Sequence, residues 1–388
     1  MRLLIFDFGS YTYEDVTDGL KRLGIGYRAV SYHFEDKNED AFFEHKFTKV
    51  LKDGKYDAVF SVNYFPLVAK CCHDNNKLYI SWSYDNPLNV PNIEKTLGYP
   101  TNRVFLFDKA QVYGYLNMGF ENIYHMPLAV NTHRLDGLIT TQEEYKRYSA
   151  EISFVGKLYE SDYELFRALC NEEQRGYLDA VTNIQQNLYG AYLLDDLIDE
   201  EYIDLINGYI KFSRPSIEFE LNKEALIYAT AANITKRDRL VILGYLSKHH
   251  ELKLYTKEFS DYLKDAICVG SCGYLDEMPK IFRNSKINLN ISFKSIQTGI
   301  PLRCMDIMGA GGFLLSNYQS ELDELFINGQ DLVLYDSIED AIAKTEFYLK
   351  NDELRKSIAL NGYNKVKDKF SYEIQLLKIL RECGIDDL

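Results

Sequence analysis

The sequence predicts an α/β protein with two doubly wound parallel sheets in tandem. Short apolar runs recur along the chain, and each is followed by a polar loop and a helical pattern. The rhythm stops in a polar stretch between about residues 127 and 150 and then starts again. The 388 residues are enough for two domains that each bury a core. We therefore expect two Rossmann-like domains whose carboxyl strand ends face across a cleft.

The N-terminal domain is expected over residues 1–130. Residues 2–8 form a predicted strand, and the helix after it has Val16, Leu20 and Leu23 on one face before Gly24 ends it. Further strands are expected at residues 27–32, 57–62, 77–83, 103–107 and 122–126. Strands that alternate with helices predict a parallel sheet, with active groups at its carboxyl edge.

The C-terminal domain is expected over residues 150–368. Its strands are predicted at residues 151–155, 252–255, 266–269, 287–291, 313–316 and 332–335. An acidic and mostly helical insertion is predicted at about residues 158–248. Residues 369–388 follow as a helix with Ile374, Leu377 and Leu380 on one face, and we expect it to return to the N-terminal domain.

The composition limits the partners and the compartment. A net charge of −14 argues against nucleic acid as a partner, although a local cation and a helix N-terminus can still bind an anionic nucleotide. The seven cysteines are scattered without C-x-x-C spacing, so neither a zinc knuckle nor a redox dithiol is expected. The run LLIFDF is too short for a signal-peptide core, and no stretch approaches 18 uncharged apolar residues. We expect a cytoplasmic protein without a transmembrane segment.

The segment of residues 286–316 carries the most information about function. A strand ends near Asn290, a polar loop follows, and Pro301 suits the first position of a helix. Arg303 and Asp306 share one face near the start of this helix, where free N–H groups and the helix dipole attract a diphosphate. Arg303 could hold the phosphates and Asp306 could accept hydrogen bonds from ribose hydroxyls. The alternative is a structural ion pair.

This segment resembles the donor-binding helix of GT-B glycosyltransferases, because DIMGAGGFLL matches their pattern of an acid, small residues and an apolar strand. The resemblance implies that Asp306 binds the donor ribose. Thr298 stands where many of these enzymes have a second acid, in an E-x7-E motif. The closer similarity is to the group 1, CgeB-like (spore maturation protein-like) enzymes and their N-terminal domain, through YDAVFSVNYFPLVAK, YISWSYDNP, VFLFDK, MPLAVN and IALNGYNKV.

Four more residues are candidates for binding the donor. By resemblance, Gly156 and Lys157 at the end of EISFVGK contact the diphosphate. The loop VGSCGY lines the base by the same resemblance, with Tyr274 or a nearby backbone amide in contact. Lys257 follows LKLY at the end of another strand and is a further candidate. The alternatives are a surface lysine and an ordinary turn. Arg237 and Arg239 near the start of a predicted helix are interpreted as part of a solvated helical face, although one of them could reach the donor.

The acceptor side is predicted in the N-terminal domain. Asp85 in SWSYDNP follows a strand, and its carboxylate could deprotonate an acceptor hydroxyl, or it could cap its own loop. His33 is the rival base, and Asn63 and Tyr64 are expected to shape the acceptor pocket. Two other acids also end strands, Asp7 and Asp108.

The chain contains no Asp-x-Asp motif, so we expect metal-independent stabilisation of the leaving group by Arg303, Lys157 and the helix N-terminus. No cofactor is expected. The co-substrate is expected to be a UDP-sugar or another nucleoside-diphosphate sugar. The leading hypothesis is a glycosyltransferase whose acceptor is a protein, a glycan or a small molecule. The alternatives are a nucleotide-sugar epimerase or hydrolase of GT-B fold, and a non-catalytic sugar-binding or assembly protein.

Overall fold

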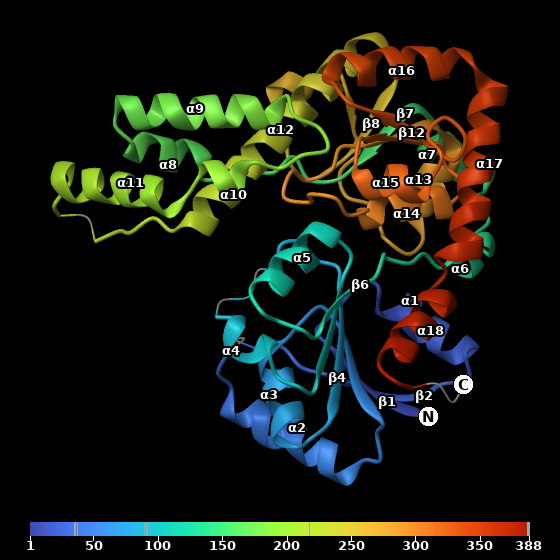
Figure 1. Cartoon of the computed structure of the whole chain (residues 1–388). Coiled ribbons are helices and arrows are strands. Elements are labelled where there is room, and N and C mark those ends of the chain that lie inside the picture. The colour runs from blue at the N-terminus through green and yellow to red at the C-terminus, as the bar shows by residue number, and fades with distance from the viewer. Residues whose placement is uncertain (35, 37, 89, 91, 217, 386–388) are drawn as a thin grey trace. The chain divides into compact units, whose positions relative to one another are not determined.

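The computed structural model describes residues 1–385 except 35, 37, 89, 91 and 217, and the chain divides into two compact units. Unit 1 consists of residues 1–138, 299–309 and 364–388, and unit 2 consists of residues 139–298 and 310–363. The described residues of each unit form one six-stranded parallel sheet with helices packed beside it (Figure 1). The predicted α/β class with two doubly wound sheets is confirmed.

The sheet of unit 1 has the strand order β2-β1-β3-β4-β5-β6. Its strands are β1 (Arg2–Asp7), β2 (Gly26–Ser31), β3 (Ala58–Val62), β4 (Leu78–Ser83), β5 (Asn102–Leu106) and β6 (Ile123–His125). The order changes direction between β1 and β3, and ligands of open α/β sheets bind at the carboxyl ends beside such a change.

The helices of unit 1 pack beside this sheet, and some of them enclose an aromatic core. They are α1 (Tyr13–Arg22), α2 (Ala41–Asp53), α3 (Pro66–Asp74), α4 (Glu94–Leu97), α5 (Lys109–Asn117), α6 (Thr132–Asp136), α14 (Leu302–Gly309) and α18 (Tyr372–Glu382). Phe6 of β1 has its ring centre 5.1 Å from that of Phe65 and 5.5 Å from that of Phe43, and Phe34 and Phe47 join the same cluster. Such large rings provide much of the apolar burial that holds the unit together.

The last helix belongs to unit 1. A Cβ atom on Gly19 of α1 would lie 2.9 Å from Cβ of Tyr372 in α18, so the two helices are in close contact. Gln375 Nε2 donates a hydrogen bond of 2.8 Å to the carbonyl of Pro127, and the amide of Val130 donates one of 3.0 Å to the carbonyl of Phe370.

Residues 299–309 also group with unit 1, although the sequence analysis assigns them to the C-terminal domain. The reason is close packing at two glycines. A Cβ atom on Gly309 would overlap the side chain of Val130, and one on Gly299 would lie 2.9 Å from Cα of Asp108.

The sheet of unit 2 has the order β12-β11-β10-β7-β8-β9. Its strands are β7 (Ala150–Val155), β8 (Leu252–Tyr255), β9 (Ile267–Cys268), β10 (Ser285–Asn290), β11 (Leu314–Asn317) and β12 (Val333–Tyr335). Numbered within the unit, this is the order 3-2-1-4-5-6 seen in dinucleotide-binding folds, and the change of direction lies between β7 and β10. The other helices near this sheet are α7 (Gln142–Tyr148), α13 (Glu277–Asn284), α15 (Ser320–Leu325), α16 (Ile338–Lys350) and α17 (Asp352–Lys369), and the division between the units falls within α17.

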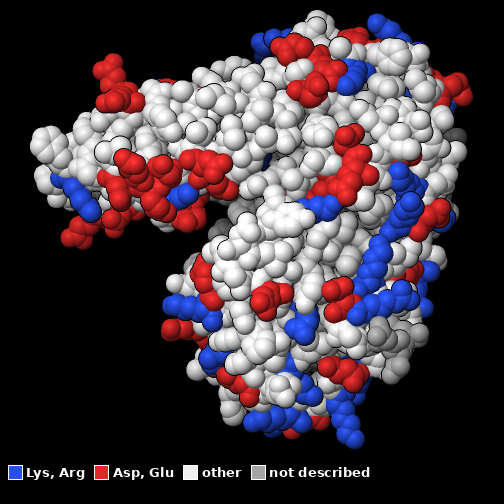
Figure 2. All heavy atoms as spheres, viewed as in Figure 1, with Lys and Arg blue, Asp and Glu red and all other residues white. Residues whose placement is uncertain are grey.

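The insertion in unit 2 is helical and forms a core of its own, to the side of β7–β12 (Figure 1). It contains α8 (Tyr163–Leu169), α9 (Glu172–Gln186), α10 (Leu194–Leu197), α11 (Glu200–Ser213) and α12 (Lys223–His249). Capping side chains start three of these helices: Asn171, Asp199 and Asn222 each accept a hydrogen bond from the first turn. Residues 158–222 hold fourteen Asp and Glu against four Lys and Arg. Figure 2 shows acidic side chains gathered on this part of the surface.

No helix among the described residues is long and apolar enough to span a bilayer.

Candidate functional site

The structure brings Asp85 and Asn63 together at the carboxyl ends of two neighbouring strands. Asn63 follows β3 with a left-handed backbone (φ 67°), and its Nδ2 atom donates a hydrogen bond of 2.8 Å to Oδ2 of Asp85, which follows β4. Oδ1 of the same amide accepts a bond of 2.7 Å from the amide of Tyr84. Asp85 is exposed. The side chain of Asn63 thus orients an accessible carboxylate, which suits a general base.

The other polar groups at this edge of the sheet have separate roles. His33 is exposed after β2, with its ring centre 4.9 Å from that of Phe8. Three strand spacings separate the ends of β2 and β4, which is about 14 Å, so His33 and Asp85 are not a pair acting on one proton. Asp7 accepts bonds of 2.9 Å and 3.1 Å from the amides of Gly9 and Ser10 and so caps its own loop. Asp108 is buried, caps α5 and accepts a bond of 2.8 Å from Asn86.

Tyr64 is buried in the core of unit 1, whereas the sequence analysis expects it to shape the acceptor pocket. Only 2% of it is exposed, and its hydroxyl donates a 3.0 Å hydrogen bond to Thr96 Oγ1 and accepts one of 3.3 Å from Asn102 Nδ2. Burial raises the pKa of this hydroxyl above its ordinary value. The ring fills the core of unit 1 because the left-handed turn at Asn63 points the next side chain inward.

Arg303 and Asp306 lie on one face of the first turns of α14. The distance from Arg303 Nη1 to Asp306 Oδ2 is 3.5 Å, and the side chains are 27% and 9% exposed. Pro301 precedes the helix, as is typical where the first N–H groups have no partner within the helix. The arrangement presents a half-buried cation close to a helix N-terminus, where an anion is stabilised.

The remaining predicted donor residues lie at carboxyl strand ends of unit 2. Gly156 follows β7 and donates a bond of 3.2 Å from its amide to the carbonyl of Tyr255 in β8. Lys157 and Lys257 are exposed after β7 and β8, and Tyr274 is half-buried in the loop between β9 and α13. They occupy the edge at which α/β sheets bind ligands.

Arg239 is buried, whereas the sequence analysis interprets it as part of a solvated helical face. Its guanidinium donates hydrogen bonds to the carbonyls of Lys157, after β7, and Ile291, after β10, the latter at 3.2 Å from Nε. It also lies over the rings of Phe154 and Tyr159, at 5.1 Å and 4.8 Å from their centres. Arg239 therefore joins the two strand ends that flank the change of direction. Arg237 lies 5.9 Å from the ring centre of Tyr163.

The loop after β10 is held by alternate side chains that begin at the last residue of β11. Asn317 Oδ1 accepts a hydrogen bond of 2.7 Å from the amide of Ser292, and Gln319 Nε2 donates one of 3.2 Å to the carbonyl of Ile296. The buried Glu321 accepts one of 2.9 Å from the hydroxyl of Thr298. Sequence reasoning missed this set, although polar residues that alternate after a strand were a visible signal.

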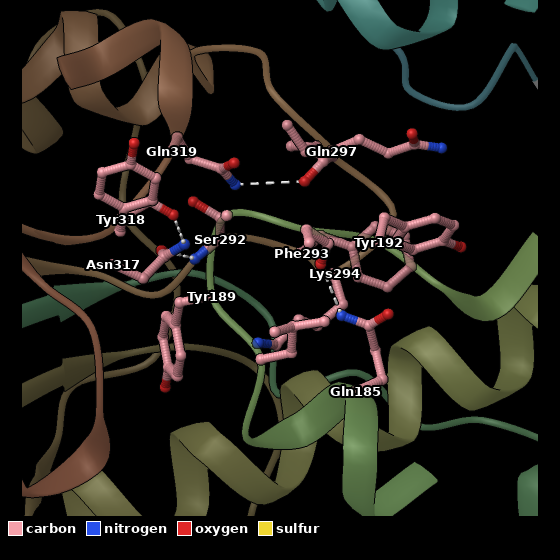
Figure 3. A pocket seen from close by; sticks show the side chains of 14 residues that line it. Gln185, Tyr189, Tyr192, Ser292, Phe293, Lys294, Gln297, Asn317, Tyr318 and Gln319 are labelled. Atoms are coloured by element: carbon pink, nitrogen blue, oxygen red, sulfur yellow. Dashed lines mark hydrogen bonds between the residues drawn. The ribbon is translucent and has the colours of Figure 1, made fainter. Parts of the chain in front are cut away.

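A pocket lies beside this loop, and Figure 3 shows its lining. Its walls come from residues 185–192 at the end of α9 and in the loop that follows, residues 292–297 after β10 and residues 317–319 at the end of β11. We call it the insertion pocket. The Lys294 ammonium points toward Tyr189 and lies 4.3 Å from the centre of that ring and 3.8 Å from Asp238 Oδ2 (Figure 3). Burial lowers the pKa of Lys294 and raises that of Asp238. Sequence reasoning missed Lys294.

Among the described residues, no three His, Cys, Asp or Glu side chains gather in a way that could hold a metal ion.

Comparisons with known proteins agree with this geometry. Residues 223–381 match the family described as Glycosyl transferase-like. No curated protein sequence matches the chain. A glycosyltransferase from Rickettsia africae has a similar structure, with a TM-score of 0.56 at 13% identity over 98% of this chain and 97% of that one. HepE of Anabaena, solved with UDP and glucose, has a TM-score of 0.53 at 10% identity over 99% of each chain. Sucrose-phosphate synthase from Thermosynechococcus elongatus has a TM-score of 0.54 at 10% identity over 99% of this chain and 98% of that one.

The structural likeness shows the fold, and with the family match it supports a glycosyltransferase of GT-B type, as the sequence predicts.

Proposed function

We propose that this enzyme transfers a sugar from a nucleoside-diphosphate donor to a hydroxyl of a protein, glycan or small-molecule acceptor, without a metal ion. The observation that carries the proposal is the pairing of Arg303 and Asp306 on the first turns of α14. HepE, which shares the fold, is solved with UDP-glucose, which supports a nucleotide sugar as the co-substrate. The resemblance to CgeB-like enzymes supports the same class, and the acidic charge and scattered cysteines support a cytoplasmic protein.

Arg303 supplies the positive charge in this proposal. The leaving nucleoside diphosphate gains negative charge as the glycosidic bond breaks, and a fixed guanidinium stabilises that charge without reorganisation. Asp306, held 3.5 Å from Arg303, accepts hydrogen bonds from the ribose hydroxyls. Contacts of Gly156, Lys157, Lys257 and Tyr274 with the donor stay predictions.

Calorimetry with UDP, GDP and dTDP tests this assignment. We expect Arg303→Met to weaken binding of the preferred nucleotide about tenfold or more, because it removes a charge-assisted hydrogen bond, and Arg303→Lys to retain part of it. EDTA should change nothing. Arg147→Met, on an exposed arginine of unit 2, is the matched control. Normal binding by Arg303→Met, or loss of binding in EDTA, contradicts the proposal.

Asp85 is the proposed base for the acceptor hydroxyl. Asp85→Asn keeps the size of the side chain but removes the proton acceptor, so transfer should fall by about 100-fold or more while donor binding stays the same. The control is Asp74→Asn, which changes an exposed carboxylate on α3. Transfer near the wild-type rate would return Asp85 to a loop-capping role and make His33 the next residue to test.

A further inference from the structure

The insertion pocket lies beside the position at which the fold binds ligands. In the strand order of unit 2, the change of direction falls between β7 and β10, and the pocket opens at the ends of β10 and β11. It is thus displaced from that point by about one strand spacing, roughly 5 Å. The loop with Tyr274 follows β9, at the opposite edge of the same sheet. In a nucleotide sugar the base and the sugar are on opposite sides of the diphosphate. With the base at Tyr274, as the sequence predicts, the sugar is directed toward the pocket.

The wall that the insertion contributes is fixed before any ligand binds. Gln185 holds the loop through bonds of 3.0 Å to the carbonyl of Ala191 and 2.7 Å from the amide of Leu193. Gly190 has a left-handed backbone (φ 78°), and a Cβ atom there would lie 2.7 Å from the ring of Tyr318 after β11. The loop therefore packs directly on the end of the sheet. Because this wall is already ordered, a ligand that binds against it loses little conformational entropy of the protein.

The polar groups in the pocket match hydroxyl groups. The Lys294 side chain is 12% exposed, and its separation of 3.8 Å from Asp238 is longer than a hydrogen bond, so its donors can serve a ligand. Asp238 also accepts a bond of 3.2 Å from Gln186. The burial of both charges costs folding free energy, which is typical of groups kept for binding. A ligand carboxylate would bring a second negative charge beside Asp238, whereas hydroxyls bring none.

The size of the pocket decides how much of a ligand enters. The hollow measures about 320 Å³ with the open solvent at its mouth included, and the part that admits a water molecule holds little more than one. A whole pyranose ring therefore does not fit, and the space admits a hydroxyl group at the edge of such a ring.

We propose that the insertion pocket binds the hydroxyl edge of the neutral sugar on the donor, with Lys294 donating to a hydroxyl and Tyr189 lying against the ring. The inference rests on the proposed function and gives the insertion a role: it selects the sugar.

Calorimetry with UDP and UDP-glucose, and with GDP and GDP-mannose, measures the sugar gain, defined as the Kd of the nucleotide divided by the Kd of its sugar conjugate. Lys294→Gln combined with Asp238→Asn removes both charges together, so that no buried charge loses its partner. Tyr189→Leu removes the ring wall separately. Lys211→Gln, at an exposed lysine of α11, is the matched control.

We expect the sugar gain to fall about tenfold in the double variant, because the loss of one hydrogen bond to a charged group has about that effect on Kd. The Kd of the free nucleotide should not change. Tyr189→Leu should lower the gain in the same direction, and the control should not. Equal gains in wild type and in either folded pocket variant contradict the inference alone. Wild-type protein that binds neither nucleotide contradicts the proposed function itself. A larger gain with UDP-glucuronic acid than with UDP-glucose overturns the assignment to a neutral sugar.

Discussion

Unit 2 contains two aspartate–cation pairs that differ in geometry and burial, Arg167 with Asp179 and Lys294 with Asp238. On α8 and α9 of the insertion, Arg167 donates two hydrogen bonds of 2.8 Å and 2.7 Å to the Asp179 carboxylate. Both side chains are about one third exposed. At the insertion pocket, Lys294 and Asp238 stand 3.8 Å apart and are 12% and 4% exposed. Hydrogen bonds from Arg167 lower the pKa of Asp179, whereas burial raises the pKa of Asp238.

The difference in geometry and burial means that the first pair serves the structure, whereas the second pair costs folding free energy. The fork of Arg167 satisfies both carboxylate oxygens where water still screens the charges, so it ties α8 to α9 at little cost. The pair at the pocket loses more hydration and gains a weaker contact. Stability explains the first pair and does not explain the second, which is why we assign the second to ligand binding.

The largest expected effect is on folding free energy. Lys294→Met leaves Asp238 buried without a cation and should cost about 3 kcal/mol at neutral pH, whereas Arg167→Met should cost about 1 kcal/mol or less. Replacing both partners, as in Lys294→Met with Asp238→Leu, should restore most of the loss. Urea unfolding followed by far-ultraviolet circular dichroism measures all three variants. Equal losses in the two single variants would remove the contrast between the pairs.

The two aspartates should also respond oppositely to pH. The folded pKa of Asp238 is raised above 3.8, so in the window above 3.8 the folded protein binds more protons than the unfolded chain, and stability falls as pH rises. The folded pKa of Asp179 is lowered, so its contribution is present above 3.8 and is lost as pH falls through the folded value. Stability differences between wild type and Asp238→Asn or Asp179→Asn from about pH 3 to pH 7 show both slopes. Parallel slopes would contradict the assigned shifts.

The smallest effect is expected from Arg167→Lys. An ammonium cannot make the two parallel bonds of the guanidinium, so the variant should lose about 0.5 kcal/mol. The loss should shrink at about 1 M salt, because surface charges are screened there within about 3 Å. Thermal unfolding at low and high salt measures it, with Lys211→Ala, from the exposed pair with Glu220, as the control. A loss that is independent of salt would mean that packing, and not charge, holds α8 to α9.

Local patterns were sufficient to locate the strands. Each observed strand lies within two residues of a predicted one, because apolar runs bounded by polar loops are set by neighbouring residues. The shared face of Arg303 and Asp306 follows equally from helical spacing.

Contacts between distant segments could not be predicted in this way. Lys294 meets Asp238 from 56 positions away, and Arg239 reaches the ends of β7 and β10 from the middle of a long helix. That helix, α12, buries residues around most of its circumference, so its sequence does not reveal which arginine faces inward. The burial of Tyr64 could not be predicted for a related reason. Whether a residue after a strand points into the core or toward solvent depends on the backbone angle of the residue before it.

Gly19, which leaves no room for a side chain beneath Tyr372, has a consequence for synthesis. The face of α1 around Gly19 and Leu20 emerges from the ribosome before unit 2, but α18, the helix that covers it, is translated after unit 2. Unit 1 therefore begins to fold with part of its core exposed to the chaperones of the cell, and it completes that core only after unit 2 has been translated. A premature stop codon after α17 would leave all the strands that the structure describes in place and still yield an unfinished unit 1.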